Sequence, residues 1–149
     1  MSTSKENELF VITQVLNAPI DLVWEALTDA QLLRQWCPYF PDFRPEVGFE
    51  SRFLLGSDKD HQYLHIVHVT EVVEKKKLSY TWRYNGYAGN SLVTFELAKE
   101  GSGTKLVFTH EIIEPFPDDP AFAKENFAEG WKYTVQALRR YVEHGLFVA

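Results

Sequence analysis

The fold is decided by the stretch LSYTWRYNGYAGNSLVTFELAKEGSGTKLVFTHEII, from Leu78 to Ile113. It contains three runs of alternating apolar and polar residues, separated by the turn-forming segments Asn85–Asn90 and Gly101–Gly103. A period of two is typical of strands that bury one face, and connections this short join antiparallel neighbours. The stretch therefore predicts an antiparallel meander.

The same alternation predicts which side chains share the buried face of this sheet. Large rings recur among them, so one face of the sheet is unusually aromatic. The predicted inward residues are Leu78, Tyr80, Trp82 and Tyr84, then Val93, Phe95 and Leu97, then Leu106, Phe108, His110 and Ile112.

Toward the N-terminus the strand pattern continues. FESRFLL (Phe49–Leu55) and YLHIVHVTEVV (Tyr63–Val73) are rich in β-branched and aromatic residues, and the turn Gly56–Asp60 separates them. LFVITQVL (Leu9–Leu16) is a further strand at the start of the chain. The sheet is thus expected to include the first strand and a long meander.

Two short helices are predicted between the first strand and the meander. Pro19 suits the first position of one helix, whose apolar stripe includes Val23 and Leu27. Asp29 is a typical N-cap for a second helix from Ala30 to Gln35, which Pro38 stops.

A long amphipathic helix is predicted from about Ala121 to His144, after a proline-rich breaker. With no repeat or linker, residues 1–149 are expected to form a single α+β domain. The apolar stripe comprises Phe127, Trp131, Thr134, Val135, Leu138, Tyr141 and Val142, which leaves Lys132, Gln136, Arg139, Arg140 and Glu143 for solvent.

Charge and composition exclude several classes of function. The net charge of −6 and the single short basic run Lys75–Lys77 argue against a nucleic-acid partner. No stretch has the length of a signal-peptide core or a membrane-inserted helix. Cys37 is the only cysteine, so no internal disulfide forms and a cytoplasmic location is expected.

Five segments in order resemble one known family: APIDLVWEALTDAQLLRQW, LSYTWRY, SLVTFEL, GTKLVFTH and EGWKYTVQALRRYV. The chain is similar over nearly its whole length to homologues of the activator of the 90-kilodalton heat-shock-protein ATPase. That family lies within the group of START, birch-pollen-allergen and polyketide-cyclase-like domains. The resemblance implies the helix-grip fold, a curved antiparallel sheet wrapped around a long C-terminal helix. It also implies a range of activities, from lipid, sterol and metabolite binding to polyketide cyclisation and assistance to a chaperone.

A sheet that curls around a helix leaves a wedge, which is either a ligand cavity or a core packed by side chains. For any single residue, packing is the simpler interpretation, but the set of rings favours a cavity for a small apolar or aromatic ligand. Trp36 and Phe40 are expected at its mouth. The candidate ligand-binding residues are Trp36, Phe53, Tyr80, Trp82, Tyr84, Phe95, Phe108, His110, Phe127 and Trp131.

The polar candidates predict no metal site and no cofactor. His110 and Glu111 point to opposite faces of a strand, and His61, His65 and His68 are too far apart or face opposite ways. Gly86 to Gly89 lacks the strand-to-helix context of a phosphate-binding loop. Cys37 is expected to be an inert, buried thiol.

Three functions fit these observations. Binding of a small hydrophobic ligand ranks first, with His110 and either Arg83 or Tyr84 as its polar contacts. A chaperone-activator-like protein interaction ranks second; an exposed apolar patch or a basic stripe would favour it, and the sequence displays neither. A cyclase-like enzyme ranks last, because His110 lacks an inward carboxylate partner for acid–base chemistry. The free edges of such a sheet are also compatible with a homodimer.

Overall fold

The computed structural model describes residues 9–56, 60 and 62–145. Its centre is one six-stranded antiparallel sheet with the strand order β1-β6-β5-β4-β3-β2. The meander is confirmed, because each strand from β2 to β5 pairs with the next one in sequence. The strands are β1 (Leu9–Leu16), β2 (Glu50–Gly56), β3 (Gln62–Val73), β4 (Lys77–Tyr84), β5 (Asn90–Glu100) and β6 (Gly103–Glu114).

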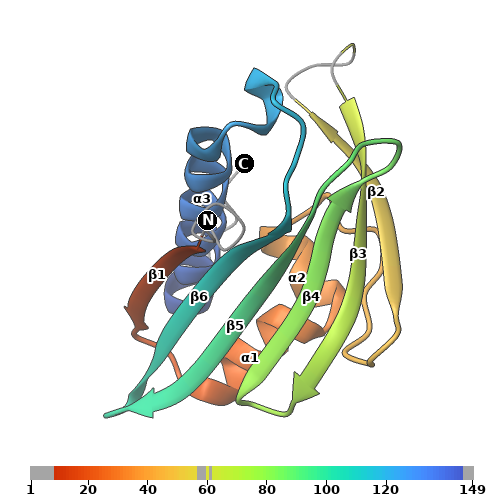
Figure 1. Ribbon diagram of the computed structural model, residues 1–149. Coiled ribbons are helices and arrows are strands. Elements are labelled where there is room, and N and C mark those ends of the chain that lie inside the picture. The colour runs from red at the N-terminus through yellow and green to blue at the C-terminus, as the bar shows by residue number, and fades with distance from the viewer. Residues whose placement is uncertain (1–8, 57–59, 61, 146–149) are drawn as a thin grey trace.

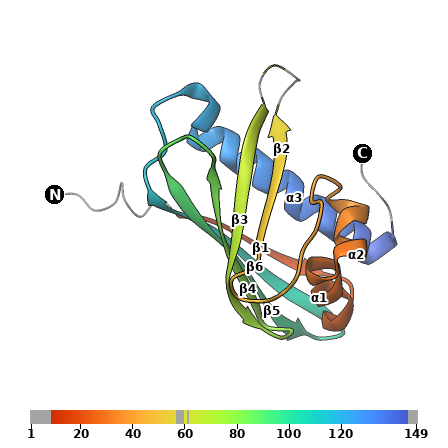
Figure 2. The same cartoon turned by 90° about the vertical axis from the view of Figure 1, so that its right-hand side faces the viewer.

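Four helical elements accompany the sheet: α1 (Ile20–Thr28), α2 (Ala30–Trp36), the short 3-10 helix η1 (Pro120–Phe122) and α3 (Lys124–His144). The sheet curves, and α3 lies across its concave side (Figures 1 and 2). The two short helices lie at one end of the same side, where they contact α3. This arrangement confirms the predicted α+β helix-grip fold.

The first strand closes the sheet on one side. It pairs with β6 from Leu9 opposite Glu111 to Leu16 opposite Thr104. The hydroxyl of Thr104, which is fully buried, donates to the carbonyl of Ala18 at 2.8 Å. The chain leaving β1 is thereby held against β6 at the point where it turns into α1.

The second short helix begins as its sequence predicts. Asp29 Oδ1 accepts hydrogen bonds from the backbone N–H groups of Gln31 at 2.9 Å and Leu32 at 3.2 Å, so it is the expected N-cap. The helix includes Trp36, one residue beyond the predicted end. Pro19 is the N-cap of α1 rather than its first residue.

The last helix starts three residues later than predicted. Asp119 accepts a hydrogen bond from the backbone N–H of Ala121 at 2.8 Å and caps η1. The chain turns again at Ala123 before α3 begins. The predicted apolar stripe is confirmed at its centre, since Trp131, Val135, Leu138 and Val142 are all buried.

Glu143 is an exception to the predicted solvent face of α3. Only 10% of its side chain is exposed, and Oε2 accepts a hydrogen bond from the backbone N–H of Asn17 at 2.8 Å. The prediction that Glu143 faces solvent is therefore wrong. Helical periodicity placed Glu143 on the polar side of α3, but its carboxylate is held against the backbone N–H of Asn17, which needs a hydrogen-bond acceptor.

Within the described residues, no helix is long and apolar enough to cross a membrane. The predicted turn between β2 and β3 falls mostly on residues 57–59, which lie outside the described residues together with His61. Apart from Ile66, the buried apolar side chains of the described residues form one cluster between the concave face of the sheet and the helices.

Candidate functional site

The concave face of the sheet carries a continuous layer of rings. The predicted inward direction is confirmed for Tyr80, Trp82 and Tyr84 on β4, which are 5–8% exposed. The same holds for Phe95 on β5 and for Phe108 and His110 on β6, which are at most 3% exposed. The strands therefore supply one face of the interior with aromatic surface.

The long helix supplies the opposite face through Trp131 and Phe127. The ring centroid of Trp131 lies 4.8 Å from that of Trp82, 5.2 Å from that of Phe108 and 5.1 Å from that of His110. Phe127, which is half-buried, lies 5.0 Å from His110. Trp131 thus joins α3 to rings on β4 and β6.

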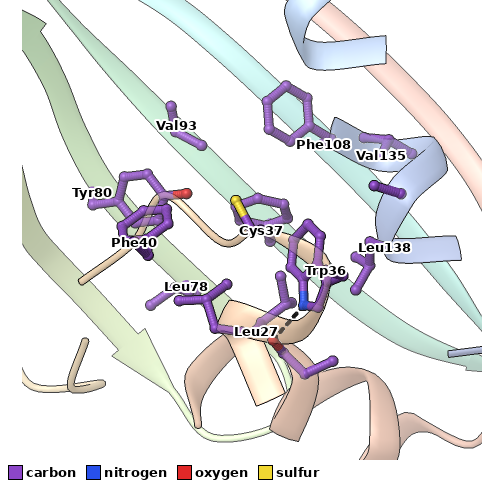
Figure 3. Packing of buried hydrophobic residues seen from close by; sticks show 14 of the residues in the cluster. Leu27, Trp36, Cys37, Phe40, Leu78, Tyr80, Val93, Phe108, Val135 and Leu138 are labelled. Atoms are coloured by element: carbon purple, nitrogen blue, oxygen red, sulfur yellow. Dashed lines mark hydrogen bonds between the residues drawn. The ribbon is translucent and has the colours of Figure 1, made fainter. Parts of the chain in front are cut away.

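The mouth expected at Trp36 and Phe40 is closed. Both side chains are buried, at 4% and 3% exposure. The indole N–H of Trp36 donates to the carbonyl of Ala26 at 2.9 Å, which ties α2 to α1 (Figure 3). Phe40 packs between Phe53, at 4.9 Å, and Tyr80, at 6.4 Å between ring centroids. These two residues seal this end of the wedge.

Very little empty space remains inside. The cavity that these rings help to line has a volume of about 10 Å³, which is at the lower limit for one water molecule. Figure 3 shows Cys37 between Trp36 and the rings of Phe40 and Tyr80. The aromatic side chains therefore fill the wedge. The cavity is lined by Leu27, Leu33, Trp36, Cys37, Tyr39, Phe40, Phe43, Leu78, Tyr80, Trp82, Phe95, Trp131 and Thr134.

Two buried side-chain atoms in this interior, His110 Nε2 and Trp131 Nε1, have no hydrogen-bond partner. They are the only such atoms among the described residues. Their rings are in contact, and the two residues are only 3% and 4% exposed. A buried polar group without a partner costs about 1–3 kcal/mol, so two on touching rings are unusual. They are the polar feature of an otherwise apolar interior.

Burial sets the protonation states of the titratable groups here. It lowers the pKa of His110 to about 4, so this imidazole is neutral near pH 7. Burial raises the pKa of Tyr84 to about 12, although the indole N–H of Trp82 donates to its hydroxyl oxygen at 3.0 Å. The pKa of Cys37 is likewise raised to about 12 by burial, which keeps it a thiol. The interior is therefore uncharged.

One histidine of the ring layer was not among the predicted site residues. His65 on β3 stacks on Phe53 with centroids 5.1 Å apart and meets Tyr84 edge-on at 4.7 Å. Its Nδ1 lies 2.8 Å from the carbonyl of Tyr63. The signal that could have found it is its position in the register opposite Tyr84 and Phe53.

The structure also places the other polar residues that the sequence offered as ligand contacts or metal ligands. The prediction of Arg83 as a ligand contact is wrong. Arg83 is next to Tyr84 on β4, so its side chain points to the opposite face of the sheet, where it interacts with exposed Glu50. His68 is also outside, 3.9 Å from Glu50, whereas His65 faces in. In the part of the chain that the structure describes, no three His, Cys, Asp or Glu side chains are grouped as metal ligands would be.

Irregular segments also contribute rings that the alternation of strands could not indicate. Tyr39 and Phe43 come from the segment between α2 and β2, and Phe116 and Phe122 come from the segment between β6 and α3. The ring centroid of Phe116 lies 5.2 Å from that of Phe127, the half-buried ring next to His110. The interior is thus bordered on two sides by loops.

Comparison with known proteins gives a family match. The model of a family described as Activator of Hsp90 ATPase homolog 1-like protein matches residues 17–143. No curated protein matches the chain.

Solved structures resemble the chain along most of its length. Protein CV1439 from Chromobacterium violaceum is 25% identical, with a TM-score of 0.75 over 91% of this chain and 96% of its own. Protein MLL2253 from Mesorhizobium loti is 26% identical, with a TM-score of 0.73 over 89% of this chain and 95% of its own. DynU16, described as a protein in the dynemicin biosynthetic locus, is 24% identical, with a TM-score of 0.74 over 93% of this chain and 48% of its own. DynU16 is evidence for the fold alone.

Proposed function

The chain belongs to the family of Activator of Hsp90 ATPase homolog 1-like proteins, and we propose that it uses this fold to bind a small, mainly apolar molecule that carries an oxygen atom. The observation behind the proposal is the pair of unpartnered buried nitrogens, His110 Nε2 and Trp131 Nε1, on rings in contact. A ligand oxygen placed against them would supply the missing hydrogen bonds.

The chemistry of the two nitrogens specifies the polar part of the ligand. An indole N–H can only donate, so its partner must accept. Neutral His110 presents either a donor or an acceptor at Nε2, depending on its tautomer. A hydroxyl oxygen satisfies both cases and a carbonyl oxygen satisfies one. A phenol, an alcohol or a ketone therefore fits, whereas a charged group would lose its hydration in the uncharged interior.

The surrounding rings specify the rest of the ligand. Phe108, Phe127 and Trp82 offer flat apolar surface next to the two nitrogens, and such surface suits aromatic or sterol-like molecules. Because the cavity measures only about 10 Å³, the ligand has to displace side chains. The loop rings Phe116 and Phe40 are the best placed to move, since loops open at lower free energy than strands.

Binding is favoured over catalysis because the interior has no acid–base pair. Among the residues described as buried, none is Asp or Glu, and the polar ones are Ser, Thr and His. General acid–base chemistry at His110 would need a second group that holds or accepts the proton. With a pKa near 4 the imidazole is also a poor base at neutral pH.

Native mass spectrometry of the purified full chain is the test, followed by organic extraction of any small molecule that accompanies it. The apo protein should then be titrated with a long-chain alcohol, a sterol and a flat phenol, with tryptophan fluorescence as the second readout. A stoichiometric mass shift supports the proposal. A clean apo mass with no shift for any of the three contradicts it.

Two variants locate the site. Trp131→Phe removes the indole N–H and keeps an aromatic ring, so we expect the affinity for the phenol to fall roughly tenfold, the value of one hydrogen bond. Trp24→Phe is the matched control, because Trp24 is buried in α1 and does not line the cavity. Equal losses in both variants would contradict a site at Trp131.

A further inference from the structure

A second hollow lies on the surface of the molecule, and it differs in character from the enclosed interior. It is a groove of about 1030 Å³ that shares no lining residue with the enclosed cavity. Figure 1 places its three borders, the start of α1, the β3–β4 turn and the β5–β6 end of the sheet, at one end of the molecule. We call it the lysine groove; its lining residues are Ile20, Asp21, Val73, Lys75, Lys76, Lys77, Glu96, Leu97, Ala98, Lys99, Lys105 and Val107.

The charge of the lysine groove is opposite to that of the whole chain. Five lysines and two carboxylates line it, in a protein with a net charge of −6. Three sequence segments supply these lysines, which is why the short run Lys75–Lys77 alone did not indicate a basic stripe. Like charges gathered on an acidic protein raise the local concentration of anionic partners.

Carboxylates already bind to lysines at this end of the molecule. Lys75 Nζ lies 3.1 Å from Asp21 of α1, and Lys77 Nζ lies 3.1 Å from Glu71 of β3. The lysine ammonium groups can thus reach carboxylates on neighbouring elements. Asp21 is 67% exposed, so an incoming carboxylate can compete with it for Lys75.

The backbone of Lys75 is in the left-handed region, with φ at +62°. Glycine adopts this conformation without cost, whereas a residue with a side chain is strained there. Among the described residues it is the only non-glycine with positive φ. A charged side chain is thus present at a turn position where backbone preference alone would favour glycine, and such strain is often associated with a functional site.

The floor of the lysine groove is apolar. Val73 is 42% exposed, and Ile20 and Val107 are partly exposed beside it. Free phosphate would gain nothing from this surface. A flat membrane would reach the lysines at the rim and leave the floor uncovered. An extended peptide with both acidic and apolar side chains matches rim and floor together.

We propose that the lysine groove binds an acidic, partly apolar segment of another protein. Lysines are flexible point charges rather than rigid forks, which suits a series of carboxylates without fixed geometry. The lysine groove is a basic surface of the kind that favours a protein-interaction role. This proposal does not depend on the ligand proposed for the interior.

The test is titration of the full chain, labelled with nitrogen-15, with a peptide that alternates Glu and Leu. Amide shifts should concentrate at Lys76, Lys99 and Val107, and binding should weaken as salt is added. A Gln–Leu peptide is the uncharged control. No binding of the Glu–Leu peptide, or equal binding of both peptides, would overturn the proposal.

Charge-reversal variants distinguish the effect of the groove lysines on peptide binding from the effect of the protein's net charge. Replacing Lys76, Lys99 and Lys105 with Glu should weaken peptide binding roughly tenfold or more. The matched control replaces Lys124, Lys132 and Arg140, on the exposed side of α3, with Glu as well. The net charge then changes by the same amount in both triple variants. Equal weakening of peptide binding in both triple variants would overturn the proposal. It would also be overturned if phosphatidylserine vesicles or inorganic phosphate bound at these lysines and the peptide did not.

Lys75→Gly distinguishes binding from folding. The substitution relieves the left-handed backbone and removes one cation, so we expect weaker peptide binding with an unchanged or higher Tm. An unchanged peptide affinity would count against a role for Lys75 in the lysine groove.

Discussion

The backbone N–H of Asn17 donates a 2.8 Å hydrogen bond to Glu143 Oε2, across 126 positions of sequence. This bond joins the end of β1 to the last turn of α3. Arg139 contacts the same carboxylate from one helical turn away, with its Nε 3.3 Å from Oε1. The hydrogen bond from Asn17 is the main cause of a lowered pKa at Glu143.

Glu143→Ala should therefore destabilise the fold by about 1–2 kcal/mol, because a charge-assisted hydrogen bond is lost. Urea denaturation near pH 7 measures this. Since the pKa of Glu143 is lowered in the folded state, its contribution is present above the ordinary pKa and disappears as the pH falls through the folded value. Glu129→Ala is the control, because the Glu129 side chain is 79% exposed and its pairing with Lys132 contributes little. Equal losses for both would show that the bond to Asn17 is unimportant.

His110 makes stability depend on pH in the acidic range. Its pKa is about 4 in the folded state and 6.5 ordinarily, so the unfolded chain binds more protons between these values. Its contribution to stability is complete above about pH 6.5 and decreases as the pH falls toward 4, by roughly 3 kcal/mol in total. His110→Gln should reduce this decrease in urea titrations at a series of pH values. His68→Gln, on the exposed face, should leave this loss of stability at acidic pH unchanged. An equal reduction of the loss in both variants would contradict its attribution to His110.

Trp131→Ala should cost about 3–5 kcal/mol, because a fully packed ring is removed from between α3 and the sheet. Trp131→Phe should cost less than half as much, since most of the ring contacts survive and the indole N–H has no partner to lose. Thermal and urea unfolding give both values. A loss well below this range for Trp131→Ala would indicate that the interior is looser than the small cavity implies.

Gly89→Ala should destabilise the β4–β5 hairpin. Gly89 has a φ of +108°, and an added Cβ would overlap the ring and backbone of Phe116. We expect a loss of roughly 2–4 kcal/mol. Gly86→Ala is the matched control in the same turn, because its φ is +82° but nothing lies within 4 Å of the added Cβ; it should cost about 1 kcal/mol. Similar losses would mean that Phe116 moves aside freely.

The sequence predicted those parts of the fold that depend on local patterns. Alternation located β4, β5 and β6 and the direction of Tyr80, Phe95 and Phe108, because burial of one face imposes a period of two. The cap at Asp29 was predictable for a similar reason, since its hydrogen bonds lie within three residues of it.

The rest depends on contacts between distant segments. Nothing near Glu143 in sequence indicated the donor at Asn17, and the lysine groove needed three segments brought to one end of the sheet. His65 was missed because His65, Ile66 and Val67 are all buried, so β3 shows no alternation there. The filling of the wedge could not be predicted, because it depends on loop rings such as Phe40 and Phe116.

The position of β1 has a consequence for the order in which the protein is made. This strand leaves the ribosome before the other strands of the sheet, yet Leu9 pairs with Glu111, about a hundred residues later. Its partner β6 and the helix that covers it, α3, are synthesised after β2 to β5. The meander from β2 to β6 can form from neighbours in sequence, but pairing over such a separation is slow. During translation, β1 thus waits as an unpaired apolar strand, exposed to whatever binds nascent chains.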